Sequence, residues 1–200
     1  MIRTPEALIP YVLAIACVLA GYVWHLGDSV GGLGRTITLG RAEIGGPFHL
    51  IDQNGEKRSD RDFRGRYMLV YFGYTHCPDV CPLTLEEMAD ALDKLGAPKA
   101  ARIVPVFVTV DPARDTPKVM KAYVASFGKG FVGLSGDAKS VEAAEHAYRV
   151  YARRHALPGG DYAMDHSSTM YLMGPDGKFV TTYEEVDGPD KIAENLRARL

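Results

Sequence analysis

The sequence predicts an α/β fold in which a central mixed sheet is flanked by helices, preceded by an N-terminal transmembrane helix. Three observations support this: continuous apolar runs of strand length, helix-period apolar stripes that alternate with them, and one long uncharged segment near the N-terminus. The chain has 200 residues, of which 46% are hydrophobic. That is enough for one domain with a packed core and a short appendage.

Two apolar runs are expected to form buried central strands. Residues 67–73 and 103–110 are almost continuously apolar, as in strands that are covered on both faces. A short early strand is expected at residues 48–51. Residues 169–173 and 178–183 flank a Gly-Pro-Asp-Gly turn, which is typical of a hairpin.

Four segments are expected to be helical: residues 82–95, 116–127, 140–148 and 189–200. Pro82 opens the first and Gly96 ends it, while Thr116 and Pro117 supply the cap and first turn of the second. The order β-α-β-α-(α)-β-β-α predicts a sheet covered on both faces, with an antiparallel pair added by the closing hairpin. This is the thioredoxin plan.

The first segment of the chain is expected to be a membrane anchor. Residues 7–27 contain no Asp, Glu, Lys or Arg, and about 20 residues at ~1.5 Å each span a hydrocarbon core ~30 Å thick. A cleaved signal peptide is the alternative, because Ala14 and Ala16 precede Cys17 like a processing site. The apolar run continues past Cys17, which favours the anchor.

We therefore expect three segments: a membrane anchor at residues 1–27, a glycine-rich tether at 28–34, and a thioredoxin-like domain at 35–200. The net charge is -2, from 25 acidic and 23 basic side chains. Because the chain has no excess of positive charge to neutralise a phosphate backbone, no nucleic-acid partner is expected.

The chemistry of the chain is expected at Cys77 and Cys81, which follow the strand at residues 67–73. In open sheets of this kind, ligands meet the carboxyl ends of the strands. Two thiols four residues apart at the start of a helix can share one ion at ~2.3 Å, and the helix dipole lowers their pKa below ~8.5. They are also suited to dithiol redox chemistry, although thioredoxin-type reductases have two intervening residues and not three.

A histidine is the expected third ligand, since two sulfurs and one nitrogen suit Cu(I), or Cu(II) if a carboxylate or water joins. We prefer His166, which lies just before the strand at residues 169–173 in a loop that can approach the cysteines. His76 adjoins Cys77 and is less suitable, because neighbouring side chains in an extended segment point to opposite faces.

Residues 73–82, Gly-Tyr-Thr-His-Cys-Pro-Asp-Val-Cys-Pro, resemble the signature of the Sco/SenC family of copper proteins. Further segments that resemble the family are residues 46–48, 110–117, 165–167 and 175–177. The resemblance implies a thioredoxin-like fold on one N-terminal anchor. It also implies that one copper ion per domain is bound by Cys77, Cys81 and His166.

The resemblance further implies a role in assembling the dinuclear copper centre of cytochrome c oxidase subunit II. The chain would act there as a copper donor or, alternatively, as a thiol-disulfide oxidoreductase that reduces the cysteines of that centre. Another copper chaperone or a thiol reductant would be a second partner. The implied location is the bacterial inner membrane, single pass, with the soluble domain in the periplasm. Redox or copper sensing and peroxidase chemistry are weaker alternatives.

Four carboxylates are candidates for orienting the loop or the imidazole: Asp79, Asp111, Asp115 and Asp165. Asp111 and Asp115 follow the strand at residues 103–110, again at the end where ligands bind. A purely structural interpretation has Arg114 paired with one of them. We prefer that interpretation for Asp115, as a helix cap.

Overall fold

A computed structural model describes residues 17–22 and 44–200, and the chain divides into the compact units Met1–Arg41 and Ala42–Leu200. In the first unit, residues 17–22 are helical and Cys17 is exposed. The expected anchor, tether and boundary at residue 35 lie almost wholly outside the described residues and stay predictions. Within the described ranges, no helix is long and apolar enough to cross a membrane.

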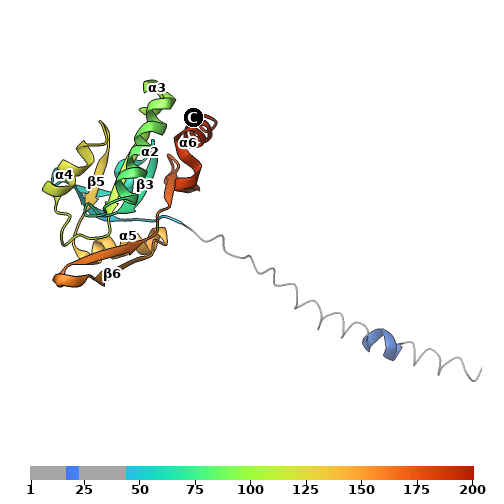
Figure 1. Cartoon of the computed structure of the whole chain (residues 1–200). Helices are drawn as coiled ribbons and strands as arrows, with labels where there is room; N and C mark the ends of the chain where they lie inside the picture. Colours follow the sequence, from blue (N-terminus) through green and yellow to red (C-terminus); the bar gives the residue numbers. More distant parts are fainter. Residues whose placement is uncertain (1–16, 23–43) are drawn as a thin grey trace, which may run out of the picture. The chain divides into compact units, whose positions relative to one another are not determined.

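The second unit is built on a seven-stranded sheet with the order β2-β1-β5-β4-β3-β8-β9 (Figure 1). Its strands are β1 (His49–Asp52), β2 (Lys57–Ser59), β3 (Tyr67–Gly73), β4 (Ile103–Thr109), β5 (Val132–Ser135), β8 (Met170–Met173) and β9 (Phe179–Tyr183). The central strands β3, β4 and β5 run parallel, and β8 and β9 add an antiparallel pair. The predicted mixed sheet is confirmed.

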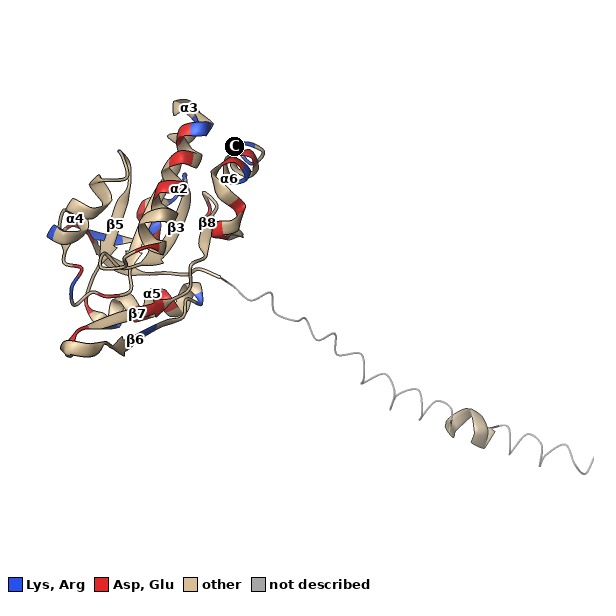
Figure 2. Ribbon diagram, viewed as in Figure 1, with Lys and Arg blue, Asp and Glu red and all other residues tan. Residues whose placement is uncertain are grey.

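Helices cover both faces of this sheet (Figures 1 and 2). They are α2 (Val80–Leu95), α3 (Ala97–Ala100), α4 (Pro117–Ala125), α5 (Ala138–Tyr148) and α6 (Gly188–Arg197), with short 3-10 turns η3 (Asp60–Phe63), η4 (Pro158–Gly160) and η5 (Glu185–Asp187). Successive β3 side chains point to opposite faces. Tyr71 therefore faces Cys81 of α2, whereas Phe72 packs on Tyr148 of α5. Helices α2 and α6 pack against each other.

The predicted element order is wrong because it lacks four strands, β2, β5, β6 and β7. Strands β2 and β5 are short, and β5 contains Gly133, where a Cβ would lie 3.0 Å from Val124 of α4. Strands β6 (Ala152–Ala156) and β7 (Tyr162–His166) form a separate two-stranded hairpin. Because β6 is largely exposed, it lacks the apolar alternation that marks a half-buried strand. The structure thus places His166 at the end of a strand, where a loop was expected.

Candidate metal centre

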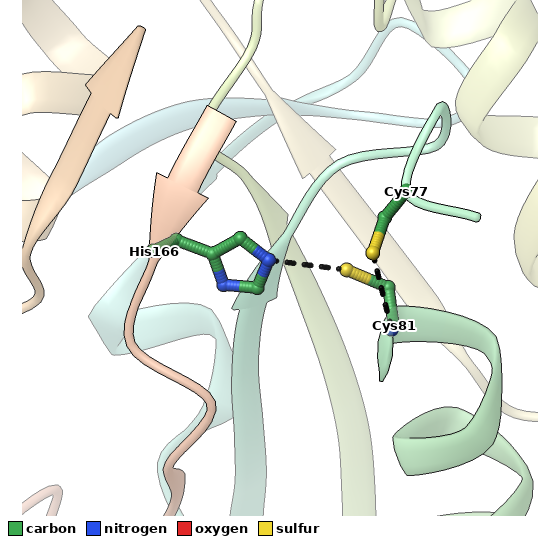
Figure 3. A group of neighbouring side chains, drawn as sticks. All are labelled: Cys77, Cys81 and His166. Carbon is green, nitrogen blue, oxygen red and sulfur yellow. Dashed lines mark hydrogen bonds between the residues drawn. The ribbon is translucent and has the colours of Figure 1, made fainter. Parts of the chain in front are cut away.

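Cys77 and Cys81 lie at the carboxyl end of β3, as predicted (Figure 3). The chain leaves β3 after Gly73 and enters α2 at Val80, so Cys81 sits in the first turn of the helix and Cys77 in the loop before it. Cys81 is fully buried and Cys77 is 9% exposed. The Cys81 backbone N–H donates to the Cys77 sulfur at 3.4 Å, and both thiols are free. The loop and the first turn of α2 together hold the two sulfurs side by side.

His166 reaches the same point from the other end of the chain. Strand β8 is antiparallel to β3, and its first residue, Met170, pairs with Tyr71. The residues just before β8 therefore lie at the edge where β3 ends. The His166 Nε2 atom is 3.3 Å from the Cys81 sulfur, and the ligand atoms of Cys77, Cys81 and His166 all lie within 4.8 Å of one another.

The imidazole of His166 is oriented for metal binding. Its Nδ1 lies 3.0 Å from the Ser167 carbonyl oxygen, which can only accept a hydrogen bond. In the neutral ring Nδ1 therefore carries the proton, and Nε2 presents its lone pair to the sulfurs. Tyr71 and Tyr74 contact the ring edge-on, with centroids 6.1 and 5.7 Å away.

The two thiols share one proton unequally. The hydrogen bond with Cys81 lowers the pKa of Cys77 to about 4, a shift that burial opposes and that the neighbouring His166 ring and the backbone of Cys81 and Asp79 assist. The same hydrogen bond, together with burial, raises the pKa of Cys81. At neutral pH the pair is therefore a Cys77 thiolate beside a Cys81 thiol. A metal that binds both sulfurs must displace the remaining proton.

Asp115 holds the loop that carries Cys77. Its fully buried carboxylate accepts hydrogen bonds from the Thr75 backbone N–H at 3.0 Å, the Thr75 hydroxyl at 2.6 Å and the Thr109 hydroxyl at 2.6 Å. The cap interpretation of Asp115 was wrong, because the Thr116 side chain caps α4 by accepting from the Val119 N–H. Asp115 instead ties the end of β4 to the segment two residues before Cys77.

The other predicted carboxylates are not among the clustered ligand atoms of the described residues. Asp111 is buried and pairs with Arg114, as one interpretation expected. The Asp165 carboxylate lies 3.2 Å from Nδ1 of His155 and makes no such contact with the imidazole of His166. Asp79 occupies the N-cap position of α2 without a side-chain cap bond.

His76 is exposed and its ring lies beside Thr75, with Nδ1 3.1 Å from the hydroxyl oxygen. It is absent from the cluster of neighbouring ligand atoms among the described residues. The contributions of Thr75, Thr109 and the two tyrosines were missed from the sequence. Neither threonine nor tyrosine is a residue type that binds soft metals. Only the positions of these residues, near the carboxyl ends of β3 and β4, could have indicated that they support the site.

Cys77 should be alkylated much faster than Cys81 at mildly acidic pH. Because the pKa of Cys77 is lowered to about 4, the Cys77 thiol is ionised across pH 5–8. An ordinary thiol has a pKa of ~8.5, so its thiolate fraction falls about tenfold for each pH unit below that value. In a Cys17→Ser full chain, iodoacetamide labelling followed by peptide mass spectrometry should give a nearly pH-independent rate at Cys77. A rate that climbs tenfold per unit from pH 5 would contradict the assignment.

Fold and site together define a thioredoxin-like α/β protein with a buried dithiol and a facing imidazole, a donor set for a soft metal ion. A model of one family, SCO1/SenC, matches residues 37–200. The chain belongs to the SCO1/SenC family.

Individual relatives agree with this assignment. The chain is 42% identical over 168 residues to the mitochondrial protein SCO2 homolog of Danio rerio, covering 83% of this chain and 59% of that protein. It is 44% identical to the structure of Bradyrhizobium japonicum ScoI with copper bound, with a TM-score of 0.73, covering 78% of this chain and 99% of that one.

A third relative, BsSco, is described as a member of the Sco family of cytochrome c oxidase assembly proteins, with a disulfide switch. It is 27% identical, with a TM-score of 0.62, covering 78% of this chain and 94% of that chain. The chain spans about three-fifths of the length of the Danio rerio relative that it matches.

Proposed function

We propose that this chain binds one copper ion through Cys77, Cys81 and His166 and delivers it to the dinuclear copper centre of cytochrome c oxidase subunit II. One observation carries the proposal: two sulfurs and an imidazole Nε2 from distant parts of the chain lie within 4.8 Å of one another. Ligand atoms bound at ~2.0 to 2.3 Å from one ion would need only a small adjustment from this arrangement.

The donor set favours copper over structural zinc. Among the residues that the structure describes, this cluster offers three ligands, two of them soft thiolates. Structural zinc sites have four protein ligands, while Cu(I) accepts a soft set of this kind. The ScoI structure from Bradyrhizobium japonicum holds copper, which supports the same choice.

The proposed setting follows from the expected anchor and from the family. We place the chain in the bacterial inner membrane, with residues 1–27 as a single span and the metal-binding domain in the periplasm. The description of BsSco as a cytochrome c oxidase assembly protein supports an oxidase subunit as the recipient. A second copper chaperone would load the site, or a thiol reductant would keep its cysteines reduced.

Replacing His166 by alanine should weaken copper binding about 10- to 100-fold, because one of three ligands is lost while both sulfurs remain. Cu(I) affinity is measured on the full chain in detergent by competition with a chromophoric chelator, and X-ray absorption reports imidazole at the metal. His155→Ala is the matched control, since His155 lies on the same hairpin outside the cluster. Unchanged affinity and coordination in His166→Ala would refute the ligand set.

The second candidate function is reduction of the disulfide of a partner. The observation that favours it is the asymmetry of the two cysteines: Cys77 is 9% exposed and accepts a hydrogen bond from the Cys81 backbone N–H, whereas Cys81 is fully buried. The lowered pKa of Cys77 agrees with a role as the attacking sulfur. The Cys77 thiolate would attack one sulfur of the partner's disulfide and expel the other as a thiolate. Cys81, losing its proton, would then attack the mixed disulfide. The products are a reduced partner and a Cys77–Cys81 disulfide, which an external thiol must reduce again.

A metal-free assay separates the two functions. A peptide that carries the two cysteines of the recipient centre as a disulfide is mixed with the reduced full chain and an excess of external thiol. The reductase function requires turnover that survives His166→Ala and is lost in Cys77→Ser. A copper donor without reductase activity shows no turnover above that of the thiol alone.

A further inference from the structure

The third ligand sits on an element that makes no strand pairing with the central sheet. Within residues 17–22 and 44–200, strands β6 and β7 pair only with each other, from Ala152 opposite His166 to Ala156 opposite Tyr162. Figure 1 shows this hairpin beside the sheet and not within it. Apart from the short link from His166 to β8, contacts of the hairpin with the body of the domain therefore fix where His166 lies relative to the sulfurs.

One face of β7 makes those contacts. Because side chains alternate along a strand, Tyr162, Met164 and His166 point to the same side. Met164 packs against the hydrophobic core, and its backbone hydrogen-bonds to the Tyr74 hydroxyl. The ligand is therefore the last of three inward-facing side chains, and Tyr162 is the first.

Tyr162 is held at both its hydroxyl and its ring. The hydroxyl donates to the Asp111 carboxylate at 2.9 Å. The guanidinium carbons of Arg114 and Arg154 lie 3.7 and 3.5 Å from the centroid of the ring. Two groups this close to one centroid fit only on opposite faces, so the ring is sandwiched between two cations.

Arg114 connects this clamp to the body of the domain. It pairs with Asp111 through Nε and donates from Nη1 to the Tyr162 carbonyl oxygen at 3.1 Å. Asp111 is 4% exposed, and its backbone N–H donates to the Thr109 hydroxyl oxygen at 2.8 Å. The same Thr109 hydroxyl donates to Asp115, which holds the cysteine loop. One polar network thus fixes both halves of the site.

We propose that Asp111, Arg114 and Tyr162 form a latch that docks the β6–β7 hairpin and so places His166 against Cys77 and Cys81. The latch rests on the proposed copper site. Its residues are positioning residues, because none is among the ligand atoms. When the latch opens, the imidazole leaves with the hairpin while both sulfurs stay in place, so copper held by two thiolates is exposed to a recipient.

Tyr162→Ala tests the latch through copper affinity and the imidazole count by X-ray absorption on the full chain. If the hairpin is docked in only a tenth of the molecules, we expect affinity to fall about tenfold and the imidazole contribution to shrink. Tyr162→Phe keeps the stacked ring and loses only the hydroxyl, so its loss should be smaller, about threefold. His155→Ala removes a contact with Asp165 on the same hairpin, on the face opposite Tyr162, and should change neither quantity.

The decisive comparison repeats Tyr162→Ala in a His166→Ala background. If Tyr162 acts through the imidazole, it should change affinity less than twofold there. An equal loss in both backgrounds, or an unchanged imidazole count in Tyr162→Ala alone, overturns the latch while leaving the ligand set intact. Wild-type protein whose copper carries no imidazole overturns the ligand set and the latch together.

Discussion

Replacing Asp115 by alanine should lower the free energy of unfolding by about 3 to 5 kcal/mol. The substitution leaves three donors without an acceptor, from the Thr75 backbone, the Thr75 hydroxyl and the Thr109 hydroxyl. Each buried polar group left unsatisfied costs about 1 to 3 kcal/mol, and hydroxyls that rotate to new acceptors recover part of it. Denaturant unfolding of the variant and of the wild-type protein measures the difference in the free energy of unfolding.

Asp115→Asn separates the charge from the shape of the side chain. An amide oxygen can still accept from the Thr75 N–H, while the amide nitrogen faces a Thr75 hydroxyl that can turn to accept. We expect a loss of about 1 to 2 kcal/mol. Asp165→Ala is the control, because that carboxylate is about half exposed and its contact with His155, near the surface, is worth little. Equal stability of Asp115→Ala and Asp165→Ala would contradict the role given to Asp115.

Replacing Gly73 by alanine should weaken copper binding about 100-fold with a loss of about 1 to 3 kcal/mol in stability. A Cβ at this position would lie 2.7 Å from the Cys81 sulfur and 2.9 Å from Phe107. Phe107 is fully buried and cannot yield easily. The easier relief is rotation of the Cys81 side chain, which takes its sulfur away from His166.

The matched control is Gly46→Ala. Its Cβ would meet only the Ala147 methyl at 3.5 Å, an ordinary contact, and copper affinity should not change. X-ray absorption on the Gly73→Ala protein should show fewer sulfur ligands per copper than in wild type. Two sulfurs at wild-type affinity would show that the pocket absorbs the methyl group elsewhere, and would refute the argument from close packing.

Both predictions concern residues whose importance is not visible in the sequence. Gly73 ends an apolar run like many glycines, and its constraint comes from Cys81, eight residues later, and from Phe107 on the next strand. Asp115 lies beside a Thr-Pro cap signal, which favoured a local interpretation that the structure corrects. The partners that decide both roles come from other strands, so local pattern alone could not supply them.

Much of the fold was predictable because buried strands and helices show an apolar pattern in the sequence. The run at residues 67–73 is β3 to the residue, and the run at 103–110 exceeds β4 by one residue. Strand β5 and the β6–β7 hairpin show no such apolar run. Strand β5 is short and contains a glycine, and the two strands of the hairpin are partly exposed. Their places are set by what they pack against.

The amino-acid pattern alone was enough to predict the buried central strands, the helices between them and the position of two cysteines at the start of a helix. Those features depend on neighbours within a few residues, so short stretches of the sequence are enough to predict them. Long-range packing, in contrast, brings the Nε2 atom of residue 166 to the sulfurs and lets Asp115 and Tyr162 support the two halves of the site. These contacts join residues 40 to 85 positions apart, and the antiparallel entry of β8 beside β3, together with the docked hairpin, brings them together.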